Sequence, residues 1–276
     1  MKGKAMLCAP FHAAKAEDDR IDEWDIKYIP GHNDPIKLVN FLDQYSSKTI
    51  NMSCPLGIEP QAIEPLLRFD NLAIRLCSEK DFESIRWLSE KGARFFLDEP
   101  FAASSWKQLD DQISFGCCQI YLKDDLTHCL PKVYNVCQKN SVGVRCVLNH
   151  VHSNGIYRGE RETDWFIRPE DMEYASQYYD VFEFDCTYMN ENRDYAWSVF
   201  DALYRSYFEK ERYTGNLQEL NPQIKYQFNN RCYGDLYARR GECGFHCAQG
   251  SSCKMCSHHR ELADTLYEKN IVVRKG

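Results

Sequence analysis

The chain has 276 residues, of which 43% are hydrophobic and 13% aromatic, and its 34 Lys and Arg residues against 41 Asp and Glu residues give a net charge of -7. The aromatic content excludes a disordered chain, because disorder goes with few aromatic residues. No apolar run approaches the roughly 18 residues that a membrane-spanning helix needs, so we expect no membrane partner. The negative charge argues against a surface that binds nucleic acid throughout, but it leaves room for a local basic patch.

The N-terminal stretch MKGKAMLCAPFHAAKA shares features with a signal peptide, but Pro10 and His12 interrupt its short apolar part. The chain also contains 14 cysteines, and disulfides chiefly stabilise secreted domains that are too small to build a core. A chain of this length buries a core unaided. We therefore predict reduced thiols or metal ligands, and a cytoplasmic location.

Short apolar runs rich in β-branched and aromatic residues recur at regular intervals and predict strands. Segments with the spacing of amphipathic helices, such as 35–45 and 81–92, lie between them. Strands that alternate with helices form parallel βαβ units, and eight units close into a (β/α)₈ TIM-type barrel of about 250 residues. The eight predicted strands cover 25–29, 49–54, 72–77, 94–98, 118–123, 143–149, 165–168 and 181–185.

An open doubly wound sheet is the alternative fold. Such sheets usually have fewer strands and more often carry a glycine-rich nucleotide loop, and neither G-x-G-x-x-G nor G-x-x-x-x-G-K-[ST] occurs here. We predict that the barrel covers residues 1–214 and that residues 215–276 form a cysteine-rich metal-binding tail with a terminal helix over 258–270. The seventh unit leaves room only for a short helix within 171–180.

The parity of each strand predicts which side chains enter the barrel. The outward faces of parallel barrel strands lie under helices and should be apolar, so the opposite parity points into the lumen. In 143–149, for example, Val144 and Cys146 point outward, and Arg145 and Val147 point inward. The pattern of 25–29 does not decide the direction of Lys27. By the same rule the inward positions elsewhere include Asn51, Ser53, Ala73, Arg75, Asp98, Gln119, Tyr121, Lys123, Asn149, Arg168, Glu183 and Asp185.

Several of these inward residues are charged and fall near the carboxyl ends of their strands, where barrel enzymes build their active sites. Asp98 and Asp185 could act as a general base or hold a divalent ion, and Lys123 could polarise a carbonyl or form a Schiff base. The predicted catalytic residues are Asp98, Lys123, Asn149, Arg168, Glu183 and Asp185.

Arg75 and Arg145 are predicted to bind the substrate, because the planar guanidinium group favours phosphate or carboxylate. The alternative is that these two arginines form an internal ion-pair layer with Glu183 and take no part in the chemistry. His150 and His152 could bind zinc, but loop histidines without a third partner are more often exposed.

The cysteines divide into two groups. Nine of them, from Cys8 to Cys186, lie in apolar segments, where a buried thiol behaves as a small apolar side chain. The other five lie close together, and four of these follow the pattern C-x3-C-x5-C-x2-C, in which two close pairs can surround one metal with sulfur. Zinc is the favoured metal, and a 4Fe–4S cluster is the alternative. The predicted ligands are Cys243, Cys247, Cys253 and Cys256, with Cys232 as a candidate fifth.

The barrel repeats ISFGCCQIYLKDDL and LPKVYNVCQKNSVGVRCVLN, followed by an R-C…G-x-C-x-x-x-C motif, resemble the collagenase-like peptidase superfamily. The motif consists here of Arg231, Cys232, Gly241, Cys243 and Cys247. The resemblance implies a TIM-like barrel, and it also implies iron–sulfur chemistry, because members of the superfamily hydroxylate RNA bases or quinone precursors. The cysteines here are closer together than in the family, and the final CKMC pair is more typical of a zinc knuckle.

Three functions therefore remain open. The first is an enzyme that acts on a small polar or anionic substrate at the carboxyl mouth of the barrel. The second is an RNA-binding or RNA-modifying protein that uses the tail, and the third is a barrel scaffold without catalysis. The RNA hypothesis depends on the positive charge of residues 225–260, which contain Lys225, Arg231, Arg239, Arg240, Lys254 and Arg260 against Asp235 and Glu242.

Overall fold

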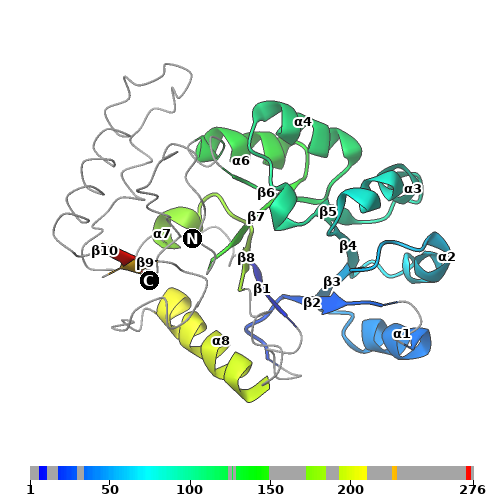
Figure 1. The fold of residues 1–276 in the computed structure, drawn as a ribbon, viewed down its shortest axis with the longest axis horizontal. Coiled ribbons are helices and arrows are strands. Elements are labelled where there is room, and N and C mark those ends of the chain that lie inside the picture. Colours follow the sequence, from blue (N-terminus) through cyan, green and yellow to red (C-terminus); the bar gives the residue numbers. More distant parts are fainter. Residues whose placement is uncertain are drawn as a thin grey trace.

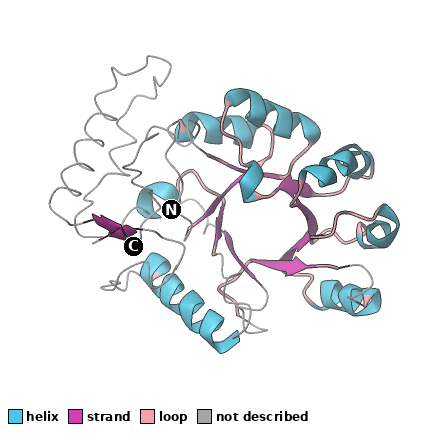
Figure 2. Cartoon of the chain, viewed as in Figure 1, coloured by secondary structure: helices cyan, strands magenta, loops and turns pink. Residues whose placement is uncertain are grey.

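The structure is a computed structural model that describes residues 6–10, 18–29, 34–123, 126, 129–148, 172–184, 193–209, 226–228 and 272–274. Eight parallel strands curl into a closed barrel in which each strand pairs with the next and β8 pairs with β1 (Figure 2). This confirms the predicted fold as a parallel α/β barrel. The strands are β1 (Met6–Pro10), β2 (Glu23–Lys27), β3 (Thr49–Ser53), β4 (Leu72–Leu76), β5 (Phe95–Leu97), β6 (Gln119–Tyr121), β7 (Gly143–Val147) and β8 (Val181–Glu183).

Two strands differ from the prediction. The first strand of the barrel is β1, in a stretch that the sequence analysis did not identify as a strand because it is short and ends at Pro10. The predicted strand 165–168 lies outside the described residues, and its predicted place between the neighbouring strands is wrong. Residues 145–147 of β7 pair directly with residues 181–183 of β8, so no strand lies between them.

Helices surround the ring of strands (Figure 1). Their ends follow local signals. In α4, for example, the Ser105 hydroxyl accepts a hydrogen bond from the backbone N–H of Gln108, and Gly116 ends the helix at a φ of 89°. The short helix expected within 171–180 is α7. The helices are α1 (Pro35–Gln44), α2 (Pro60–Ile63), α3 (Ile85–Glu90), α4 (Trp106–Phe115), α6 (Leu130–Lys139), α7 (Met172–Ala175) and α8 (Arg193–Phe208), with 3₁₀ turns at Glu64–Leu66, Glu79–Ser84 and Glu99–Phe101.

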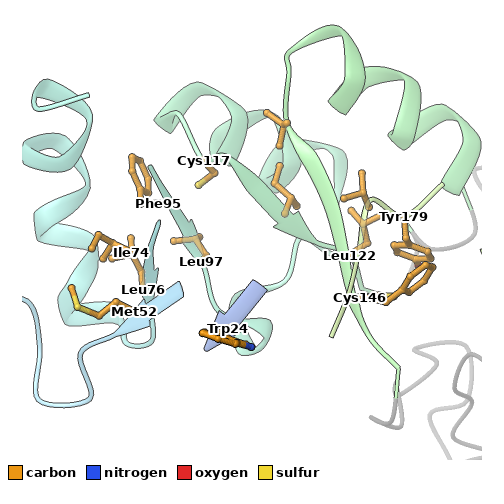
Figure 3. Packing of buried hydrophobic residues seen from close by; sticks show 14 of the residues in the cluster. Trp24, Met52, Ile74, Leu76, Phe95, Leu97, Cys117, Leu122, Cys146 and Tyr179 are labelled. Carbon is orange, nitrogen blue, oxygen red and sulfur yellow. The ribbon is translucent and has the colours of Figure 1, made fainter. Parts of the chain in front are cut away.

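The main apolar core lies between the strands and the helices. Figure 3 shows Met52 of β3 with Ile74 and Leu76 of β4 in this layer, and Cys146 of β7 belongs to it as well. A second, smaller cluster fills part of the barrel interior, where Tyr121 packs with Ala73, Phe96 and Val147. The predicted parity of β4, β6 and β7 is therefore confirmed.

Arg20 ties the segment before β2 to α8. Its Nη2 atom lies 2.8 Å from Oδ2 of Asp18, and its Nη1 atom lies 2.8 Å from Oδ1 of Asp201. The guanidinium group also stacks on α8, 4.9 Å from the ring centre of Trp197 and 4.7 Å from that of Tyr204. One cation therefore joins the start of the chain's second strand to its last barrel helix.

Two short strands, β9 (Tyr226–Phe228) and β10 (Val272–Arg274), form an antiparallel pair in the C-terminal part of the chain. The sequence analysis did not predict this pair. The cysteine-rich segment and the predicted helix 258–270 lie outside the described residues, so the boundary near residue 214 stays a prediction. Among the described helices, none combines the length and the apolar character needed to cross a bilayer.

Candidate functional site

A fully buried layer of charged and polar side chains crosses the barrel near its middle. Arg145 of β7 has no exposed surface, and its Nη1 atom donates a hydrogen bond of 2.7 Å to Oε2 of Glu23 on β2. Glu23 also accepts hydrogen bonds of 2.9 Å from the side-chain amides of Asn51 and Gln119. On the other side, Nε of Arg145 lies 2.9 Å from Oε2 of Glu183 on β8. This buried layer links five strands through side chains alone.

A second layer lies closer to the carboxyl ends of the strands and centres on Arg75 of β4. Its Nη1 atom donates to Oδ2 of Asp25 at 2.7 Å and to Oε1 of Glu183 at 3.0 Å, and its Nε atom donates to Oδ1 of Asp98 at 2.7 Å. The side chains of Arg75, Asp25 and Asp98 are 13%, 15% and 20% exposed. A ligand that enters from this end would therefore meet these three groups, which we call the mouth layer.

Tyr121 of β6 joins the buried layer through its hydroxyl. Its hydroxyl donates to Oε2 of Glu183 and accepts a hydrogen bond of 2.9 Å from Nε of Arg145. The Arg145 guanidinium lies 4.9 Å from the ring centre of Phe96, so aromatic rings cover the buried layer. Glu183 accepts hydrogen bonds from both arginines and from Tyr121, and it therefore connects the buried layer with the mouth layer.

The two carboxyl groups that share Nη1 of Arg75 have opposite shifts in pKa. Burial raises the pKa of Asp25 to about 6, and Arg75 only partly offsets this effect. Burial also acts to raise the pKa of Glu183, but Arg75, Arg145 and Tyr121 together lower it to about 2. Burial raises the pKa of the Tyr121 hydroxyl, which keeps its proton and remains a donor. Such a divergent pair of carboxyl groups can separate a proton-holding group from a permanent charge.

The structure brings four of the predicted site residues together. Arg75, Arg145 and Glu183 form the internal ion pairs that the sequence analysis named as the alternative to substrate binding, and Asp98 joins them through Arg75. Lys123 is half-buried and forms no ion pair with another described residue. Asn149, Arg168 and Asp185, together with His150 and His152, lie outside the described residues.

Sequence reasoning missed Glu23 and Asp25. The predicted strand began at residue 25, which removed Glu23 and left Asp25 as a terminal residue of undecided direction. The stretch from Glu23 to Lys27 alternates charged and apolar residues, and Trp24 between the two carboxylates is fully buried. That alternation is the signal that identifies Glu23 and Asp25 as lumen residues. Lys27, whose direction was undecided, is exposed.

The described residues contain no group of three or more His, Cys, Asp or Glu side chains arranged to hold a metal ion. The five candidate cysteine ligands of the tail lie outside the described residues. Seven of the nine scattered cysteines are described with their side chains, and all seven are buried or half-buried, as predicted. Burial raises the pKa of thiols such as Cys54 and Cys137 to about 12, so they stay protonated.

Comparisons with known proteins do not assign a family. No family model matches the chain, and no curated protein matches it. Among solved structures, a glycerol uptake operon antiterminator-related protein from Thermotoga maritima is similar with 15% identity and a TM-score of 0.37, over 65% of this chain and 94% of that one.

Two further solved structures show the same degree of likeness. Tryptophan synthase from M. tuberculosis has 11% identity and a TM-score of 0.38, over 70% of this chain and 88% of that one. A U32 peptidase has 13% identity and a TM-score of 0.38, over 67% of this chain and 95% of that one. All three TM-scores lie below 0.5, so the barrel is established by its own strand pairing and not by these likenesses.

Proposed function

We propose that the chain is an enzyme that binds a small polar substrate at the carboxyl mouth of the barrel, with the mouth layer as its active site. One observation carries the proposal. Arg75, Asp25 and Asp98 keep some contact with solvent, directly above a layer in which Arg145 has none. Enzymes with parallel α/β barrels act at this end of their strands, and the opposite end serves stability.

The charges of the mouth layer narrow the substrate class. Three carboxylates surround the single guanidinium of Arg75, because Asp25, Asp98 and Glu183 all accept from it. A phosphate or carboxylate of a substrate would have to compete with these groups and would meet net negative charge. A substrate with hydroxyl or amino groups fits the layer better than the anionic class that the arginines alone suggested.

A scaffold without catalysis would not need carboxyl groups with divergent pKa values. Such values cluster at functional sites, and they occur here in Asp25 of the mouth layer and in Glu183 of the buried layer, which both accept hydrogen bonds from Arg75. We include Lys123, Asn149 and Asp185 as further members of the site, since the sequence places them at the same ends of their strands. This part of the proposal rests on the sequence pattern.

A binding screen tests the proposal. We would measure the thermal unfolding of the full chain with a panel of small hydroxy and amino metabolites, and follow turnover of each stabilising compound by mass spectrometry. Asp98→Asn keeps the shape of the side chain and removes its charge, and Asp43→Asn, on the exposed face of α1, is the matched control. We expect a ligand whose affinity falls about tenfold in Asp98→Asn and not in Asp43→Asn. Equal affinity in both variants would place the ligand elsewhere and contradict the proposal.

We propose further that Cys243, Cys247, Cys253 and Cys256 hold a zinc ion that stabilises the tail. The support is the spacing of two close cysteine pairs and the preference of zinc for four thiolates. The resemblance to the collagenase-like peptidase superfamily supports a 4Fe–4S cluster instead, with Cys232 as an additional candidate. Anaerobic purification followed by metal analysis separates the two, since zinc is colourless and the cluster is brown. Finding neither metal would contradict the site.

The RNA hypothesis remains a second candidate because of the basic residues between 225 and 260. Binding through these side chains should weaken as salt is added, because phosphate contacts release counterions. We expect binding of tRNA, if the tail provides it, to fall when Arg239 and Arg240 are both replaced by alanine. Undiminished binding in that variant would exclude the tail as the RNA site.

A further inference from the structure

The described side chains of the barrel interior carry more acid than base. Burying an ionised carboxylate without full compensation is costly, and a carboxyl group in such a place takes up a proton instead. One of the acids is therefore expected to hold a proton that the others lack. The groups are the carboxylates of Glu23, Asp25, Asp98 and Glu183 and the guanidiniums of Arg75 and Arg145.

Three of the four carboxylates are well supplied with donors. Glu183 accepts from Arg75, Arg145 and Tyr121. Glu23 accepts from Arg145 and from two side-chain amides. Asp98 accepts from Arg75 and, at 2.8 Å, from the backbone N–H of Glu99. Each of these three groups accepts hydrogen bonds from at least two donors.

Asp25 is the exception. Its Oδ2 atom accepts one hydrogen bond, of 2.7 Å, from Nη1 of Arg75. Its Oδ1 atom is enclosed and has no donor within hydrogen-bond distance among the described residues, and Nη2 of Arg145 lies 3.8 Å away from it. The carboxyl group with the fewest donors is thus the one whose second oxygen is shut off from water.

The elements packed around Asp25 do not correct this deficit. Arg75 of β4 and Arg145 of β7 favour the ionised form, and Glu183 of β8 and Glu23 of its own strand oppose it. The neighbouring strands add no described charge, since β1 pairs opposite Asp25 at Pro10 and β3 does so at Asn51. Burial therefore decides the balance and raises the pKa of Asp25.

We propose that Asp25 is the proton-holding group of the barrel and carries its proton at mildly acidic pH while Glu183 stays ionised. The inference deepens the proposed function, because it names the group of the mouth layer that would exchange a proton with a substrate. Only this exchange rests on the proposed function; the protonation of Asp25 itself does not. Donation would leave a carboxylate on Asp25 that Arg75 already faces. Glu183, with three donors, acts as the fixed negative charge.

Carbon-13 NMR of the full chain labelled at the γ-carbon of aspartate tests the inference without any substrate. The signal of each aspartate moves as its carboxyl group ionises, so a titration between about pH 4 and 8 reads the proton directly. We expect one signal with a midpoint near pH 6. That signal should vanish in Asp25→Asn, and also in Asp25→Glu, which keeps a carboxyl group but no label. It should persist in the exposed control Asp43→Asn.

Two results would overturn the inference: all aspartate signals titrating below about pH 5 in the wild-type chain, or a midpoint near pH 6 that persists in both Asp25 variants. The first of these results needs only the wild-type titration, so it can be obtained even if a variant does not fold. Because no ligand is involved, a metabolite screen without hits leaves the inference standing. A failed titration in turn leaves the mouth layer as a candidate binding site.

Discussion

Nε of Arg145 and Oε2 of Glu183 lie 2.9 Å apart inside the barrel, where the two side chains are 0% and 4% exposed. The two residues are on adjacent strands, β7 and β8, and Glu183 extends from this buried pair to Arg75 in the mouth layer. A buried pair of this kind fixes the position of a carboxylate that the candidate site uses. Removing the pair should therefore lower the stability of the fold and disturb the site.

Replacing Arg145 by methionine should lower the free energy of unfolding by about 3–5 kcal/mol, since it leaves Glu23 and Glu183 buried without their shared cation. Arg145 lowers the pKa of Glu183, so this pKa rises in the folded variant and the loss should be larger at pH 8 than at pH 5. Urea unfolding measures it. Arg86→Met, which removes only the exposed pair with Glu90, is the control, and an equal effect of both variants would contradict a structural role for the buried layer.

The pKa of Asp25 predicts how stability depends on pH. The folded-state pKa of about 6 lies above the ordinary value of 3.8, so the folded protein binds this proton more tightly than the unfolded chain. Ionisation of Asp25 therefore costs stability as pH rises from about 4 to 6, by about 1–3 kcal/mol in total. The free energy of unfolding of Asp25→Asn, relative to that of the wild type, should therefore rise by that amount between about pH 4 and 6. Urea unfolding at several pH values measures this difference. A constant difference between the two proteins would be the contrary result.

Glu183 has the opposite effect in a lower window. Its pKa of about 2 lies below the ordinary value of 4.5, so its contribution to stability is complete above pH 4.5 and is lost as pH falls toward 2. Tyr121→Phe removes a hydroxyl that donates to the ionised form. We expect this variant to lose about 1–2 kcal/mol at pH 7 and to begin its acid unfolding at a higher pH than the wild type. Acid titration followed by circular dichroism checks both, and an unchanged acid midpoint would show that the hydroxyl does not support Glu183.

Arg20→Ala should destabilise the chain by about 1–2 kcal/mol, because it removes two ion pairs and the stacking on α8 together. Arg20 lowers the pKa values of Asp18 and Asp201 against the opposing effect of burial, so the loss should shrink below about pH 4. Arg20→Lys keeps the charge without the planar guanidinium group, and its free energy of unfolding should lie between those of the wild type and Arg20→Ala. A lysine variant as weak as the alanine variant would assign the effect to geometry alone.

The barrel could be predicted because its strands repeat a simple rule. In β4 and β7 the residues under the helices are apolar, so the parity of Arg75 and Arg145 followed from their neighbours in sequence. The rule failed at β1 and β2 for two reasons. Residues 6–10 are few and end in proline, and the run at 23–27 begins with a charged residue, which hides the strand start at Glu23.

The contacts within the site could not be predicted from the sequence, because they depend on the register between distant strands. Arg75 and Glu183 are 108 positions apart, and Arg145 and Glu23 are 122 apart. Parity states that such residues enter the lumen, but only the stagger of the strands decides which level each one reaches. For that reason the sequence could name an ion-pair layer and substrate binding as alternatives without choosing between them.

The most direct test of the mouth layer as a binding site is NMR of the full chain with nitrogen-15 in its arginine side chains. Arg75 and Arg145 then serve as probe and internal control, since one reaches the mouth and the other is enclosed. Pools of hydroxy and amino metabolites are added in turn, with the two Nε–H signals assigned through Arg75→Lys and Arg145→Lys. We predict that at least one pool shifts the signal of Arg75 more than that of Arg145. If no pool moves Arg75, or if pools that bind shift only other arginines, the mouth layer is not the site.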